Sequence, residues 1–302
     1  MKFPSLRGEI KLNEPMSNHT SFRIGGAVDA LVAPVDRQDL VALLQEIRDR
    51  HLPFVVLGGG TNLLVRDGGF RGVAVSLKKM TSIGISREYR SLGGSFAVIT
   101  VEAGAMLARL LSFSVERGLT GLEFATGIPG TVGGAVCMNA GTAQGEMGDI
   151  IDTVTLLSPS GEPILRHREE MGFGYRTANV PADHVVLEAK VLLRYGDAGK
   201  IKDRVKQIMA GRKERQPWGL PNAGSVFKNP LDESAGKLIE SAGLKGLTVG
   251  GAQVSEKHAN FIVNRGAATA ADVLRLMEIV QEKVLEVHGI RLEPEIKIIG
   301  ED

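Results

Sequence analysis

Apolar residues recur at helical spacing in several stretches of the chain. In residues 36–51 four apolar side chains fall on one helical face, and Asp36 stands in front of them as a helix N-cap residue. The same spacing predicts helices over residues 106–118 and 269–289. A glycine, the residue type most common after a helix C-terminus, ends both of these segments. The pattern therefore predicts long amphipathic helices with defined ends.

Runs of β-branched and aromatic residues lie between these helices and predict strands. The predicted strands are residues 54–57, 63–65, 71–77, 95–105 and 184–196. Residues 152–165 predict a hairpin around Ser160 and Gly161. Because strands and helices are mixed along the chain, the pattern predicts an α+β fold.

A polar, basic helix over residues 199–215 is followed by "QPWGLPNAGS", where two prolines and two glycines stop regular structure. We therefore place a domain boundary near residue 197. The predicted units are residues 1–197, with subdomains of about 1–70 and 71–197, and residues 198–302, which end in a strand over residues 290–300.

Composition excludes several classes of function. The 302 residues include 36 basic and 35 acidic side chains, so no basic excess draws the protein to nucleic acid or to a membrane surface. The N-terminal segment lacks the apolar core of a signal peptide, so we expect a cytoplasmic protein. We also expect it to be a monomer. The scattered histidines argue against a metal site, and we expect the single cysteine, Cys137, to be a small buried residue.

Two apolar, glycine-rich segments are candidate binding loops. They are "GGGTN", residues 58–62, and "GIPGTVGG", residues 127–134. Neither matches the Rossmann or P-loop pattern. Glycine allows main-chain N–H groups to approach an anion closely, so the pair favours a long ligand with a phosphate-bearing middle. The alternative interpretation is a pair of tight turns.

Three polar segments could carry chemistry, and each also has a structural interpretation. Tyr175 and Arg176 form either an anion site or an ordinary surface pair. Ser225 lies in a turn-forming context and outside any G-x-S-x-G elbow. In the last segment Glu293 and Glu295 share one face of the predicted strand, which is either an exposed edge or part of a cleft.

Six motifs in order resemble those of the UDP-N-acetylenolpyruvoylglucosamine reductase family of peptidoglycan synthesis. The motifs are "NHTSFRIGG", "LGGGTNLLV", "GLEFATGIPGTVGGAVCMNAG", "GYRTA", "NAGSVFKNP" and "LEPEIKIIG". The resemblance spans nearly the whole chain. It implies an FAD-binding region of the para-cresol methylhydroxylase type, made of two α+β subdomains, and a C-terminal α+β substrate domain.

The resemblance also implies which residues hold a non-covalent FAD. These expected cofactor-binding residues are Gly58, Gly59, Gly60, Thr61, Asn62, Leu63, Thr126, Gly127, Pro129, Gly130, Gly133, Gly134 and Ala135. In the family NADPH delivers a hydride to FAD, and the enolpyruvyl ether of UDP-N-acetylglucosamine is then reduced to UDP-N-acetylmuramate.

By motif match, Arg176 and Glu295 would stabilise the enol-like intermediate, and Ser225 would protonate the adjacent carbon. Glu295 is chosen over Glu293 from the family pattern. We expect its carboxyl group to be protonated with substrate bound, since a carboxylate would repel the developing negative charge. Tyr175, Lys228 and Asn229 are expected substrate contacts, and Lys228 or a water would polarise Ser225.

The short connection after Arg176 resembles the second, shorter type of this family. Two other functions stay open from the sequence. One is a flavin-dependent oxidase or dehydrogenase of the same fold that acts on an alcohol or hydroxy acid. The other is a non-catalytic protein that binds a nucleotide sugar, which would be colourless when purified.

Overall fold

The computed structural model describes residues 3–302, and its contacts divide the chain into two compact units. The first unit holds the N-terminal residues through Lys11 together with Ala30–Gly59 and Gly72–Gly211. The second holds Leu12–Asp29, Gly60–Arg71 and Arg212–Asp302. Three separate stretches of chain thus build the second unit. The sequence-based boundary near residue 197 stays a prediction.

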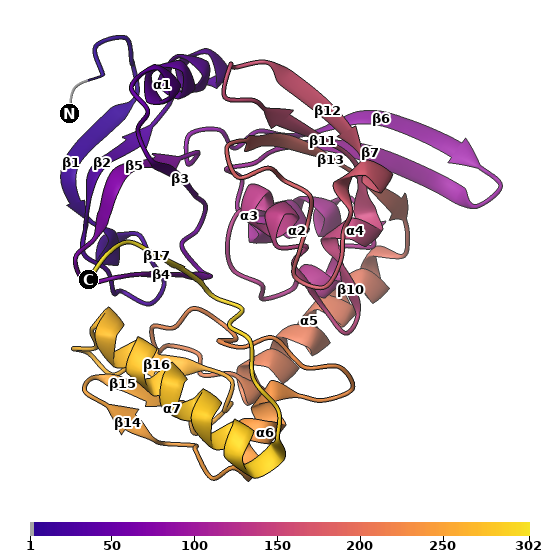
Figure 1. Ribbon diagram of the computed structural model, residues 1–302. Helices are drawn as coiled ribbons and strands as arrows, with labels where there is room; N and C mark the ends of the chain where they lie inside the picture. The colour runs from indigo at the N-terminus through magenta and orange to yellow at the C-terminus, as the bar shows by residue number, and fades with distance from the viewer. Residues whose placement is uncertain (1–2) are drawn as a thin grey trace. The chain divides into compact units, whose positions relative to one another are not determined.

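A four-stranded sheet has the order β1-β2-β5-β3 (Figure 1). Its strands are β1 (Glu9–Pro15), β2 (Ala27–Ala33), β5 (Phe70–Ser76) and β3 (Phe54–Leu57), and β3 runs parallel to β5. Helix α1 (Arg37–Asp49) packs its leucines into the same core as this sheet. Asp36 caps α1 as predicted, since its side chain accepts a hydrogen bond from the backbone N–H of Asp39.

A larger antiparallel sheet, which lies in the first unit, has the order β12-β11-β13-β7-β6. Its strands are β12 (Pro163–His167), β11 (Ile151–Leu157), β13 (Val185–Tyr195), β7 (Gly94–Glu102) and β6 (Ile83–Ser91), and β8 (Leu119–Thr120) pairs with the end of β13. The predicted hairpin is confirmed, because Leu157 pairs with Pro163 across the turn.

Short helices lie beside the larger sheet (Figure 1), and their buried apolar residues belong to the same core. They are α2 (Leu107–Glu116), α3 (Val132–Cys137) and α4 (Met147–Ile150). Gly118, with a φ of 66°, ends the predicted helix after α2. Cys137 is exposed at the end of α3, so the expectation of a buried cysteine is wrong. Helix α3 is too short for all of its apolar residues to point into the core.

The second unit has its own core around α7 (Ala270–His288), α6 (Ala235–Ser241) and a small sheet of β14 (Thr248–Val249), β15 (Ala252–Val254) and β16 (Ile262–Asn264). The basic helix α5 (Ala198–Arg215) leads the chain into this unit. Helix α7 begins with the predicted capping box of Thr269 and Asp272. Hydrogen bonds from the backbone N–H groups of Thr269 and then Gly251 lower the pKa of Asp272.

The predicted terminal strand is shorter than expected. Only β17 (Lys297–Ile299) forms regular pairs, and it lies parallel to β4 (Leu63–Val65). Leu292 and Ile296 are buried whereas Glu293 is exposed. Pro294 has no N–H to donate, and it pairs with Phe227 in an isolated bridge instead of a strand.

Candidate flavin and substrate site

The two predicted FAD loops meet in the first unit. Gly58 follows the last residue of β3, and a Cβ atom added there would lie 2.7 Å from the Thr131 Oγ1 atom. That hydroxyl accepts the backbone N–H of Gly134 at 3.4 Å and so caps α3. Any side chain at position 58 would therefore displace the cap. Gly58 and Gly134 are both exposed, which leaves bare main chain at the place where the loops approach.

The second loop is held against the end of β7. The backbone N–H of Gly133 donates to the Ala103 oxygen at 2.9 Å, and a Cβ atom on Gly133 would lie 2.8 Å from the Ala103 Cβ atom. Gly127 and Gly130 have φ angles of 75° and 116°, which favour glycine. The sequence-based choice of glycine at these positions thus has a steric reason.

Thr126 is buried at the start of this loop, and its Oγ1 atom has no hydrogen-bond partner within residues 3–302. A buried hydroxyl without a partner costs about 1–3 kcal/mol, so a bound water or a ligand is expected to satisfy it. A bare glycine surface beside an unsatisfied hydroxyl fits a flavin nucleotide, which offers phosphate oxygens and a flat polar ring. The residues present in this unit therefore fit FAD.

The rest of the first glycine segment lies in the second unit. Gly60 has a φ of 61°, and a Cβ atom there would lie 2.0 Å from the His19 oxygen. Asn62 Nδ2 donates to the backbone oxygen of Glu295 at 3.2 Å, and the backbone oxygen of Asn62 accepts the Lys297 N–H at 3.0 Å. An expected cofactor residue is thereby bonded to the backbone of an expected catalytic residue.

The Ser225 segment pairs with the Glu295 segment in the same unit. The Glu295 N–H donates to the Val226 oxygen at 2.7 Å, and the Lys228 N–H donates to the Glu293 oxygen at 2.8 Å. These bonds bring Ser225, which is half-buried, next to the chain that carries Glu295. The Lys228 ammonium group lies 3.5 Å from the Glu293 carboxylate.

Two asparagines hold this segment in place. Asn229 Oδ1 accepts the backbone N–H of Ala235 at the start of α6. Asn260 is buried, and its side-chain amide makes two hydrogen bonds with the backbone of Phe227, accepting from the N–H at 3.0 Å and donating to the oxygen at 2.8 Å. Sequence reasoning missed Asn260 because it follows Ser225 by many residues and belongs to no motif.

Arg176 lies in a tight turn of the first unit. Gly174 and Thr177 exchange backbone hydrogen bonds of 3.1 and 3.2 Å and enclose Tyr175 and Arg176. The Arg176 φ is 57°, and its guanidinium carbon lies 5.0 Å from the centre of the Tyr175 ring. Tyr175 is 48% exposed, so the turn offers a cation and an aromatic face to a ligand.

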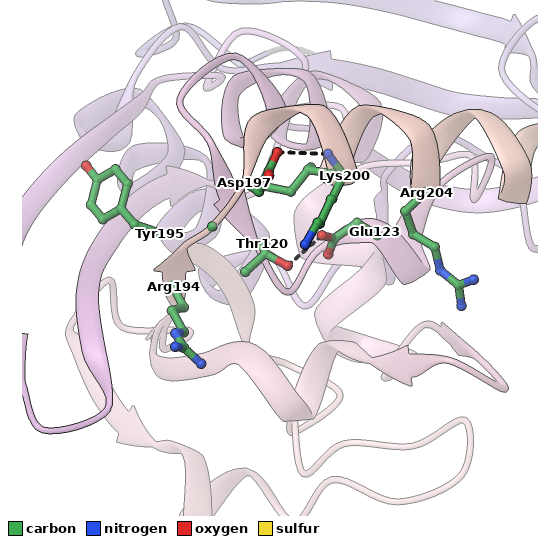
Figure 2. Close-up of a pocket in the computed structure, with 9 residues that line it drawn as sticks. Thr120, Glu123, Arg194, Tyr195, Asp197, Lys200 and Arg204 are labelled. Atoms are coloured by element: carbon green, nitrogen blue, oxygen red, sulfur yellow. Dashed lines mark hydrogen bonds between the residues drawn. The ribbon is translucent and has the colours of Figure 1, made fainter.

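A separate pocket of about 390 Å³ lies where β13 meets α5 (Figure 2). Its two carboxylates are engaged: Glu123 accepts from Thr120 Oγ1 at 2.6 Å, and Asp197 accepts the Lys200 N–H at 3.1 Å. Figure 2 shows Arg194 and Arg204 extending to opposite sides of the pocket. None of the lining residues was expected in the site, and their cationic groups do not converge.

Over residues 3–302, no helix is both long and apolar enough to cross a membrane.

Known proteins resemble this chain over nearly its full length. Residues 216–299 match the family model "UDP-N-acetylenolpyruvoylglucosamine reductase, C-terminal domain", and residues 28–165 match "FAD binding domain". The UDP-N-acetylenolpyruvoylglucosamine reductase of Geotalea uraniireducens is 44% identical over 99% of this chain and 96% of its own length. That of Desulfosudis oleivorans is 45% identical over 98% and 96%.

A solved structure agrees with these relatives. The UDP-N-acetylenolpyruvylglucosamine reductase of Thermus caldophilus shares 37% identity and a TM-score of 0.81, over 97% of this chain and 99% of that one. The expected fold class is confirmed: an FAD-binding region of the para-cresol methylhydroxylase type joined to a C-terminal α+β domain. The chain belongs to the UDP-N-acetylenolpyruvoylglucosamine reductase family.

Proposed function

We propose that this protein is an NADPH-dependent flavoenzyme that reduces the enolpyruvyl ether of UDP-N-acetylglucosamine to UDP-N-acetylmuramate. Family membership over nearly the full chain supports an FAD-containing reductase of peptidoglycan synthesis. The observation that carries the proposal is the bond from Asn62 Nδ2 to the Glu295 oxygen. It joins the segment that would hold the flavin to the segment that would act on the substrate.

The residues that would hold a non-covalent FAD are the two glycine loops and Thr126. Bound FAD would pass a hydride from NADPH to the vinyl carbon of the sugar ether. The close approach at Gly58 keeps the loops free of side chains there, and the Thr126 hydroxyl supplies an unused donor and acceptor.

The chain's own polar groups would manage charge and protons on the substrate. Hydride addition leaves negative charge conjugated with the substrate carboxylate. The Arg176 guanidinium would bind that carboxylate with its planar fork, and a protonated Glu295 would donate a hydrogen bond to the same anion. Ser225 Oγ would deliver a proton to the carbon next to the one that received the hydride.

Lys228, Asn229 and Tyr175 would contact the sugar nucleotide. The Lys228 ammonium group faces Glu293 at 3.5 Å, an exposed pairing that an incoming diphosphate could replace at little cost because such ion pairs are weak. The Asn229 side-chain oxygen accepts from the Ala235 N–H, and this bond would hold the residue in place for a substrate contact. Tyr175 offers a flat ring to a base or sugar.

The test is anaerobic and uses the visible flavin absorbance. One equivalent of NADPH should bleach the purified yellow protein, and adding the enolpyruvyl UDP-sugar should restore the colour without oxygen. Plain UDP-N-acetylglucosamine, which lacks the double bond, is the control. Bleaching without recovery would show that the sugar is not the acceptor and would favour another flavin dehydrogenase. A colourless protein that binds the sugar would favour a non-catalytic binding role.

A further inference from the structure

Asn139 follows α3 in the glycine-rich segment, and none of its surface is exposed. Its side-chain amide is bonded on both sides within the first unit. Nδ2 donates to the Gly174 oxygen at 2.9 Å, and Oδ1 accepts the Gly148 N–H at 2.8 Å. One side chain thus connects the segment that would bind the flavin to the turn that carries Arg176.

The bond to Gly174 acts at the first peptide of that turn. Gly174 pairs with Thr177, and its carbonyl belongs to the peptide plane that leads into Tyr175. Arg176 adopts a φ of 57°, which is unfavourable for a side chain with a Cβ atom and persists only where neighbouring bonds impose it. The hydrogen bond from the Asn139 amide to the Gly174 oxygen is one of those bonds.

The other end of the amide is held by a rigid neighbour. Gly148 is the second residue of α4, its oxygen accepts a short hydrogen bond from Arg168 Nε, and a Cβ atom on it would lie 2.9 Å from the Phe173 Cβ atom. Phe173 directly precedes Gly174. The position of the Gly174 carbonyl group is therefore fixed relative to the packed start of α4.

Few residue types could replace Asn139. Its own φ is 40°, which asparagine tolerates better than most residues with a side chain. The site also needs a donor and an acceptor on one short side chain. Aspartate supplies only the acceptor when ionised, and glycine keeps the backbone conformation but makes neither bond.

We propose that Asn139 is a positioning residue that holds the Tyr175–Arg176 turn so that the guanidinium group meets the substrate carboxylate. The inference rests on the proposed function only in the role that it gives Arg176. Asn139 acts through Arg176 and has no contact of its own with the reacting atoms.

The experiment compares the two half-reactions in Asn139→Gly, Arg176→Ala and the double variant. In Asn139→Gly, reoxidation of reduced flavin by the enolpyruvyl sugar should slow by about 10- to 100-fold, while bleaching by NADPH changes by less than about twofold. The reason is that only the Arg176 guanidinium group, which binds the substrate carboxylate, is misplaced. The double variant should be no slower than Arg176→Ala alone, since residues that act as one unit are not additive.

Val154→Ala is the control for lost stability, because Val154 is fully buried in β11 and lies away from the turn in sequence. It should lower the unfolding midpoint without changing the ratio of the two half-reactions. Asn139→Asp supplies a second test: its carboxyl group can donate to the Gly174 oxygen only when protonated, so its reoxidation rate should recover as the pH falls.

An independent readout is the Nε–Hε NMR signal of Arg176, assigned by its loss in Arg176→Ala. It should shift or broaden in Asn139→Gly with no substrate present. If the sugar fails to reoxidise the wild-type flavin, the proposed function is wrong, and this signal still decides the inference. Three results would each overturn the inference. They are an unmoved Arg176 signal, additive losses in the double variant, and equal slowing of both half-reactions, which is what a general loss of stability would produce.

Discussion

Asn260 should stabilise the Ser225 segment more than any surface residue near it. Phe227 is 1% exposed, and its N–H and oxygen bond to the Asn260 amide at 3.0 and 2.8 Å. In Asn260→Ala both backbone groups lose their partners in a buried place. At about 1–3 kcal/mol for each unsatisfied group, the free energy of unfolding should fall by about 2–6 kcal/mol. A water that enters the vacated volume would bring the loss to the lower end.

Asn222→Ala is the matched control in the same unit. Asn222 also makes two side-chain hydrogen bonds, to the Gly224 N–H and the Leu220 oxygen, but they are local to a half-buried turn that water can reach. Its loss should cost no more than about 1 kcal/mol. Both variants can be followed by urea unfolding with the fluorescence of Trp218, the single tryptophan, which lies in this unit.

Asn260→Asp adds a pH signature. The ionised carboxylate would face the Phe227 oxygen, which raises the pKa of the introduced acid in the folded state. A raised folded pKa gives stability that is present below the unfolded value of about 4 and is lost as the pH rises through the folded value. This variant should therefore regain stability on acidification. An Asn260→Ala loss below about 0.5 kcal/mol, or one equal to that of Asn222→Ala, would refute the reasoning.

Three further predictions concern the cofactor, the proton donor and a helix cap. Gly58→Val should yield protein with at least about tenfold weaker flavin retention after gel filtration, because the new side chain overlaps the Thr131 hydroxyl, 2.7 Å from a Cβ atom at position 58. Ser225→Ala should bleach normally with NADPH while sugar turnover falls by about 10²-fold or more, as measured by stopped flow, and unimpaired turnover would remove this serine from the mechanism. Asp272→Asn should lower stability at pH 7 by on the order of 0.5–1 kcal/mol. The lowered pKa of Asp272 means that its charge stabilises the fold above its usual value near 3.8 and ceases to do so as the pH falls further, so the variant and the wild type should converge in acid unfolding curves.

Local structure followed from the sequence because local forces determine it. The apolar period of residues 36–51 and the capping box at Thr269 specify helices that begin where the structure begins them. The turn residues around Ser160 likewise gave the hairpin. The positive φ angles at positions 127 and 130 require glycine, and any chain with this local backbone shape would need glycine there.

The candidate site depended on contacts that no local pattern specifies. No sequence feature near residue 63 predicts that its strand pairs with residue 297, yet β4 and β17 pair in parallel. The terminal segment formed a strand over only three residues because its first half bonds to the Ser225 segment around Pro294. The exposure of Cys137 was also decided by how a short helix packs.

Asn139 and Asn260 show the difference most clearly. Each is a single polar residue whose amide meets a backbone group more than thirty residues away in sequence, at Gly174 and Phe227. The sequence determined which segments could bind a flavin and carry charge. Only the tertiary structure decided which side chains hold those segments, because a hydrogen bond between residues distant in sequence forms only after folding has brought its two partners together.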